Sequence, residues 1–82
     1  MNKQTPPLSE EAENFKIGTY KHYKGNLYMA ITIARLEENL EEVVVYQPLY
    51  DEEHVWVRPL KNFIEKVTVG DKETPRFSFI EE

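Results

Sequence analysis

The sequence contains no cysteine, and this absence excludes several kinds of chemistry at once. Without thiols, the chain has no disulfide framework, no thiolate nucleophile and no cysteine-ligated zinc. Such a composition suits a reducing compartment. Long apolar runs are also missing, since no stretch approaches the roughly 18 residues of a membrane span. Residues 1–7 lack the apolar run of a signal peptide. We therefore expect a cytoplasmic protein without a membrane-spanning segment.

Glycine and serine are too sparse, or too isolated, to form the common catalytic motifs. The three glycines, Gly18, Gly25 and Gly70, stand apart from one another, so the chain has no glycine-rich loop for phosphate. Ser9 and Ser78 lie in no nucleophile motif. These absences argue against nucleotide hydrolysis and against serine-dependent acyl transfer.

Histidine is also scarce, and its spacing does not predict a metal site. His22 and His54 are the only two, and the carboxylates of Asp51 and Glu53 near His54 show no metal-ligand spacing. Acid–base catalysis by His22 would need a neighbouring carboxylate and a pocket. We expect no metal, no cofactor and no catalytic residue.

Charge is distributed unevenly along the chain, whose net charge is −5. Residues 18–35 hold Lys21, Lys24 and Arg35 and no acid, whereas residues 36–53 hold seven acids and no base. An acidic total disfavours non-specific nucleic-acid binding, which depends on neutralising phosphates. A basic patch on one face of the folded protein could still bind nucleic acid.

The N-terminal part differs from the rest of the chain. Residues 1–8 resemble a loose lead-in because consecutive prolines disfavour regular structure. Ser9 is a plausible N-cap for a short helix through Glu13, with acids placed favourably in its first turn. We therefore divide the chain into an N-terminal lead-in with a short helix (residues 1–17) and a β domain (residues 18–82).

Beyond residue 17 the spacing of apolar residues predicts strands. Leu27, Met29, Ile31 and Ile33 recur at every second position, which predicts a strand with this apolar set on one face. Gly25 and the Gly70–Asp71 pair are hairpin turn signals because glycine readily adopts positive φ. Other strands are expected near residues 18–23, 43–46, 55–58, 64–69 and 75–80, with a helical turn at residues 60–63. Five to six short strands predict a small all-β fold, a partly open barrel.

Four groups of residues also resemble a known family. They are Gly18-x-Tyr-x-His-Tyr-Lys-Gly-x-x-Tyr28, Val44-Val-Tyr-x-x-Leu-Tyr50, Trp56-Val-Arg-Pro59 and Pro75-Arg-Phe77. Together they are similar to a bacterial family catalogued as domain of unknown function 1653. The resemblance implies an SH3-like β-barrel and implies no reaction, since the family has none assigned.

One candidate recognition surface lies near the only tryptophan. In a strand, Trp56 and Arg58 point to the face opposite Val55 and Val57. If the two valines fill the core, Trp56 and Arg58 face outward beside Tyr46, as in surfaces that bind peptides or stack on bases. The alternative is that Trp56 caps the mouth of the barrel and Arg58 pairs with an acid such as Glu42.

A second candidate group lies on the first predicted strand. Tyr20, His22 and Lys24 share one face of this strand, so they could extend an aromatic groove with a cation at its edge. The alternative is cross-strand pairing, in which the aromatic rings stabilise the sheet instead.

We therefore predict a small non-catalytic binding module that recognises a peptide or protein segment, as a monomer or weak dimer. The predicted ligand-binding residues are Tyr20, His22, Lys24, Tyr46, Tyr50, Trp56 and Arg58. An alternative is RNA or single-stranded DNA binding through the same aromatic residues together with Lys21, Lys24 and Arg35. A third possibility is a small-ligand or enzymatic role centred on His22.

Overall fold

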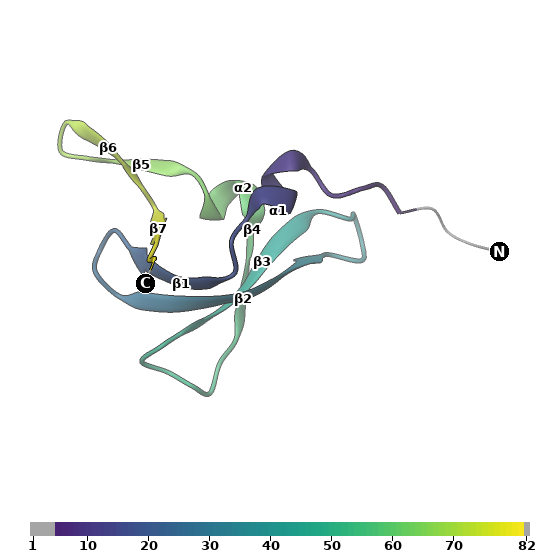
Figure 1. Cartoon of the computed structure of the whole chain (residues 1–82), viewed down its shortest axis with the longest axis horizontal. Coiled ribbons are helices and arrows are strands. Elements are labelled where there is room, and N and C mark those ends of the chain that lie inside the picture. Colours follow the sequence, from purple (N-terminus) through teal and green to yellow (C-terminus); the bar gives the residue numbers. More distant parts are fainter. Residues whose placement is uncertain (1–4, 82) are drawn as a thin grey trace.

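The computed structural model describes residues 5–81, so part of the lead-in expected over residues 1–8 lies outside the described residues. Nine elements follow one another along the chain (Figure 1). They are α1 (Glu10–Asn14), β1 (Gly18–His22), β2 (Leu27–Arg35), β3 (Glu42–Pro48), β4 (Trp56–Pro59), α2 (Leu60–Phe63), β5 (Lys66–Val69), β6 (Lys72–Pro75) and β7 (Phe77–Phe79).

Five strands form one antiparallel sheet in the order β4-β3-β2-β1-β7, and β5 pairs with β6 as a separate hairpin. Figure 1 shows both helices on one side of the large sheet and the β5–β6 hairpin projecting away from it. Within residues 5–81, β4 and β7 remain unjoined edges, so the barrel is not closed. The predicted all-β, partly open fold is confirmed, with β6 as an additional strand.

Strand β2 carries a β-bulge that changes which of its side chains enter the core. The pairing with β3 shifts between Ala30 and Thr32, so Ile31 and Thr32 are both exposed. The core therefore receives Tyr28, Ala30 and Ile33. The prediction that Leu27, Met29, Ile31 and Ile33 form one apolar face is wrong, because the extra residue of a bulge reverses the alternation beyond it.

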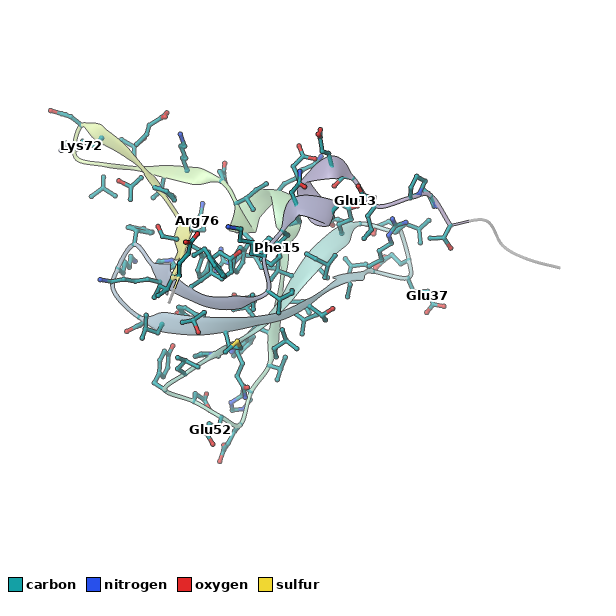
Figure 2. The ribbon with its side chains drawn as sticks, viewed as in Figure 1. Glu13, Phe15, Glu37, Glu52, Lys72 and Arg76 are labelled. Carbon is teal, nitrogen blue, oxygen red and sulfur yellow. The ribbon has the colours of Figure 1, made fainter. Side chains whose placement is uncertain are left out.

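Aromatic rings dominate the core between the sheet and α2. Phe63 and Phe77 stack with ring centroids 4.0 Å apart and nearly parallel planes. Tyr20 and Tyr46 meet Phe63 edge-on at 5.2 and 5.6 Å. Figure 2 shows side chains, the labelled Phe15 among them, gathered between the ribbon of the sheet and the helices. A domain this small buries proportionally little surface, so large rings supply much of its stability.

Hydrogen bonds to one carboxylate of the sheet hold the N-terminal helix in place. Ser9 caps α1 by accepting the backbone N–H of Ala12 at 3.1 Å, as the sequence predicted. The Glu42 carboxylate accepts both the backbone N–H and the hydroxyl of Ser9, at 2.7 and 2.6 Å. Because Ala12 is buried and Phe15 packs against the core, residues before Gly18 contribute to the folded unit.

Because Phe63 and Phe77 stack in the core, we predict that truncating one of these rings lowers the stability of the protein strongly. Phe63→Ala should lower the free energy of unfolding by about 3–5 kcal/mol, because it removes a fully buried ring and leaves a cavity. Val57→Ala is the control, since an exposed valine should change that free energy by less than about 0.5 kcal/mol. Urea denaturation followed by circular dichroism measures both. Equal effects of the two variants would contradict the assigned core.

The Ser9–Glu42 contact predicts a pH-dependent part of the stability. Hydrogen bonds from the Ser9 hydroxyl and backbone lower the pKa of Glu42, with Arg35 contributing. The stabilisation is therefore complete above the unfolded pKa of about 4.3 and is lost as pH falls through the lower folded value. Glu42→Gln should reduce the free energy of unfolding near pH 7, and its difference from the natural sequence should shrink at acid pH.

Urea denaturation across this pH range measures the effect. Glu38→Gln, in the exposed loop between β2 and β3, is the matched control and should leave the stability near pH 7 unchanged. If Glu42→Gln behaves like Glu38→Gln at every pH, the contact with Ser9 does not stabilise the protein.

Candidate aromatic–arginine face

The hairpin of β1 and β2 brings His22 and Tyr28 to the same side of the sheet. Gly25 forms the turn at φ 112°, and His22 ends β1 opposite Phe77 of β7. The His22 ring packs against the rings of Tyr23 and Phe77, with centroids 4.6 and 4.9 Å away, and lies 6.1 Å from that of Tyr28. Its position is therefore fixed by aromatic contacts on several sides.

The surroundings of His22 favour its neutral form. Burial lowers its pKa, and the positive charges of Arg58, Lys24 and Arg76 lower it further. Its Nδ1 accepts the backbone N–H of Lys24 at 3.1 Å, which leaves the proton of the neutral ring on Nε2. At neutral pH the imidazole is consequently an uncharged hydrogen-bond donor in a positive environment.

Arg58 on β4 is held by neutral groups. Its Nε–H donates to the Tyr46 hydroxyl at 3.2 Å, and an Nη1–H donates to Oδ1 of Asn62 at 2.6 Å. The guanidinium carbon lies 5.6 Å from the centre of the Phe77 ring. Within the described part of the chain, Arg58 forms no ion pair.

The alternative pairing of Arg58 with Glu42 is therefore wrong. Glu42 binds Ser9 and forms an ion pair with Arg35 instead, with Nη2 of Arg35 3.9 Å from the carboxylate. Arg35 and Glu42 are directly paired across β2 and β3, which explains why this arginine rather than Arg58 reaches the acid.

Tyr28 lies at the centre of the ring cluster. Its ring centroid is 5.4 Å from that of Phe77, 5.6 Å from that of Tyr46 and 6.3 Å from that of Tyr50. Burial and the neighbouring Tyr50 hydroxyl raise the pKa of Tyr28. Tyr50 itself is 68% exposed in the loop between β3 and β4. The cluster thus continues from the core to the surface.

Trp56 extends this surface along the edge strand. It pairs with Tyr46 across β3 and β4, is 52% exposed, and lies 6.0 Å ring-to-ring from His54. The premise that Val55 and Val57 fill the core is wrong, since both are more than half exposed. The strand's inward position is instead occupied by Arg58, because Arg58 pairs with the buried Val44.

The predicted site residues therefore divide into three groups. Tyr20 and Tyr46 are each only 7% exposed and belong to the core. Lys24 lies at the turn, with Nζ 5.8 Å from the Tyr23 ring centre. The exposed or partly exposed residues that share this side form the aromatic–arginine face: His22, Tyr28, Tyr50, Trp56 and Arg58.

Sequence reasoning left Tyr28 out of the site, although the hairpin signal could have placed it there. The turn at Gly25 sets Tyr28 directly opposite Tyr20 and so onto the side of the sheet that carries His22. Asn62 gave no such signal, because its contact with Arg58 depends on how α2 follows β4.

The cations of the nucleic-acid alternative do not gather at this face. Lys21 alternates with Tyr20 and His22, so it points to the opposite side of β1. Arg35 ends β2 and lies beside Glu42. Of the three predicted cations, Lys24 is the one whose charge acts on His22.

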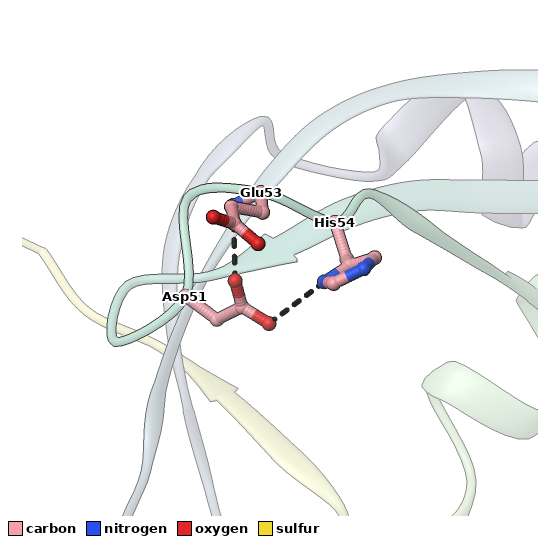
Figure 3. A group of neighbouring side chains, drawn as sticks. All are labelled: Asp51, Glu53 and His54. Atoms are coloured by element: carbon pink, nitrogen blue, oxygen red, sulfur yellow. Dashed lines mark hydrogen bonds and ion pairs between the residues drawn. The ribbon is translucent and has the colours of Figure 1, made fainter.

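Asp51, Glu53 and His54 come together in the loop between β3 and β4, with potential ligand atoms within 4.8 Å of one another (Figure 3). The Asp51 carboxylate accepts the backbone N–H of Glu53 at 2.9 Å and contacts Nδ1 of His54 at 3.0 Å. These interactions lower the pKa of Asp51. They are the ordinary contacts of a polar turn and account for the cluster without a metal.

Two of the hollows on the described surface lie away from this face. One, of about 320 Å³, is lined by Ser9, Arg35 and Leu60 among others. The other, of about 460 Å³, is lined by Phe15, Phe63 and Phe79 among others. His22 lines neither of them, so these hollows give no support to catalysis by His22.

No described helix has the length and apolar character needed to span a membrane.

The charges around His22 predict a measurable coupling. Arg58→Gln should raise the pKa of His22, because removing a nearby positive charge makes protonation of the ring easier. Long-range ¹H–¹⁵N spectra of the imidazole across a pH titration measure this value and report the Nε2–H tautomer. Lys72→Gln, at the tip of the β5–β6 hairpin (Figure 2), is the control and should leave it unchanged. An unchanged pKa in Arg58→Gln would contradict the proximity of the two side chains.

Comparison with known proteins supports the fold and identifies the family. A family described as "protein of unknown function (DUF1653)" matches residues 18–79. A crystal structure of a protein of this family from Bordetella bronchiseptica is similar, with 38% sequence identity and a TM-score of 0.77. The similarity covers 84% of this chain and 91% of that one. No curated protein matches. The chain therefore belongs to the DUF1653 family of proteins of unknown function.

Proposed function

We propose that this protein is a non-catalytic binding module whose aromatic–arginine face recognises an extended segment of another protein. The observation that carries the proposal is the combination of exposed Tyr50 and Trp56 with Arg58, a cation that has no ion-pair partner among residues 5–81. Tryptophan, tyrosine and arginine are the residues that most often dominate the binding energy of protein interfaces.

The position of the face at a sheet edge supports an extended ligand. Trp56 and Arg58 lie on β4, which within the described residues 5–81 has a neighbouring strand on one side only. An edge strand presents unpaired backbone N–H and C=O groups, to which an extended peptide can bond while its side chains contact the adjacent surface. Because Pro59 lacks an N–H, the available stretch is short, and side-chain contacts must supply most of the affinity.

Nucleic acid is the less favoured ligand. Single-stranded nucleic acids need stacking rings together with a row of cations along the backbone. The rings are available, but Lys21 and Arg35 lie away from them, and the chain as a whole carries a charge of −5.

Truncation of the face should weaken peptide binding without unfolding the domain. For a peptide selected from a random library on the natural protein, Trp56→Ala should raise Kd about tenfold or more, the range expected of an interface hot spot. Calorimetry or fluorescence polarisation measures Kd, and thermal unfolding checks that the fold is intact. Val69→Ala, an exposed apolar residue on the distant hairpin, is the matched control. Binding that Trp56→Ala leaves unchanged would place the peptide elsewhere and contradict the proposal.

A further inference from the structure

We infer, on the basis of the proposed peptide binding, that the bound segment presents a carboxylate to the guanidinium of Arg58. A guanidinium has five N–H donors. In Arg58 the protein uses the Nε–H and one Nη1–H, both with neutral acceptors, Tyr46 and Asn62. The remaining donors have no acceptor among the described residues, and the side chain is half-buried rather than free in solvent.

Neighbouring groups hold this guanidinium in place before any ligand arrives. The Tyr46 hydroxyl and Asn62 fix two of its edges, and the Phe77 ring lies beside it. Asn62 is itself positioned, since its Nδ2 contacts Glu65 at 3.4 Å and its backbone carbonyl accepts Nε–H of Arg76 at 3.1 Å. A fixed, planar fork of donors matches the two oxygens of a carboxylate and loses little side-chain entropy on binding.

The local charge favours the same ligand. The charges of Lys24, Arg58 and Arg76 all act on His22, so the surroundings of His22 are positive although the protein is acidic overall. Figure 2 shows Glu37 and Glu52 at the far ends of two loops, whereas Asp51 lies nearer the exposed end of the face, beside His54 in the loop that carries Tyr50. Arg76 has an acid of its own, Glu65 at 3.2 Å, which leaves Arg58 as the unpaired cation beside the rings.

This arrangement distinguishes a carboxylate from a polyanion. One unpaired arginine can neutralise a single anionic group, while the surrounding acidic surface repels a chain of phosphates. A peptide with one acidic side chain, or with a free C-terminal carboxylate, fits the charge of the face. The two sources share the chemistry that Arg58 would recognise, and the experiment separates them.

The test uses a soluble library of random octapeptides in two forms, one amidated at the C-terminus and one with a free carboxylate. Peptides retained by the immobilised full chain are identified by mass spectrometry. If side-chain carboxylates are recognised, the retained amidated peptides should carry Asp or Glu at one recurring position. If the C-terminal carboxylate is recognised, retention should require the free-acid form.

The affinities of individual retained peptides then measure how much the carboxylate contributes to binding. Replacing the acid of a retained peptide by its amide should raise Kd about tenfold to a hundredfold, the range for losing a charged hydrogen-bonded pair. Arg58→Gln should cause a similar loss and should equalise the acid and amide forms. Arg58→Lys should keep part of the affinity, because it retains the charge but not the fork. Lys72→Gln is the control for a lost positive charge and should change nothing.

The outcomes separate this inference from the proposed function. The retained peptides could lack a recurring carboxylate and bind equally well to the natural protein and to Arg58→Gln. That result would overturn the inferred carboxylate recognition but leave the proposed peptide binding intact. If the natural protein retains no more peptide than Trp56→Ala does, both the carboxylate recognition and the peptide binding are overturned. Preferential, salt-sensitive retention of an added twelve-nucleotide thymidine oligonucleotide would also overturn both and assign the face to nucleic acid.

Discussion

Both the core and the candidate site depend on the contacts of the Phe77 ring. On one side it stacks on Phe63 and so joins β7 to α2. On its other sides it meets His22, Tyr28 and the guanidinium of Arg58. The same ring therefore stabilises a domain with a small core and supports the surface residues that could bind a ligand. The face therefore lies directly against the core through this ring.

The charged residues of the protein also differ in the partners that hold them. Glu42 fastens the N-terminal helix through Ser9 and lies beside Arg35, and Glu65 pairs with Arg76. These contacts hold elements together. Arg58, by contrast, is positioned by neutral groups and keeps its charge uncompensated among the described residues. Folding alone gives no reason to leave a half-buried cation without an acid, and this is what makes the face a candidate for recognition.

The accuracy of sequence reasoning differed between elements and sites. The Gly25 turn, the Ser9 cap and the helical turn at residues 60–63 were predicted correctly because each depends on neighbours within a few residues. The face of β2 was predicted wrongly because a bulge at Ile31 is not visible in an alternating pattern. Tyr46 was assigned to a surface, but its hydroxyl instead orients Arg58 from within the core.

The sequence by itself determined the all-β class, the main turns and the family to which the chain belongs. These follow from local backbone preferences and from motifs that can be read in order along the chain. Only the tertiary structure decided which tyrosines are buried and which acid each arginine approaches. Alternation defines two faces of a strand without saying which is inside, and ion pairs form between residues that folding brings together. Arg35 thus lies beside Glu42, while Arg58, sixteen residues beyond that acid, remains beside the exposed rings.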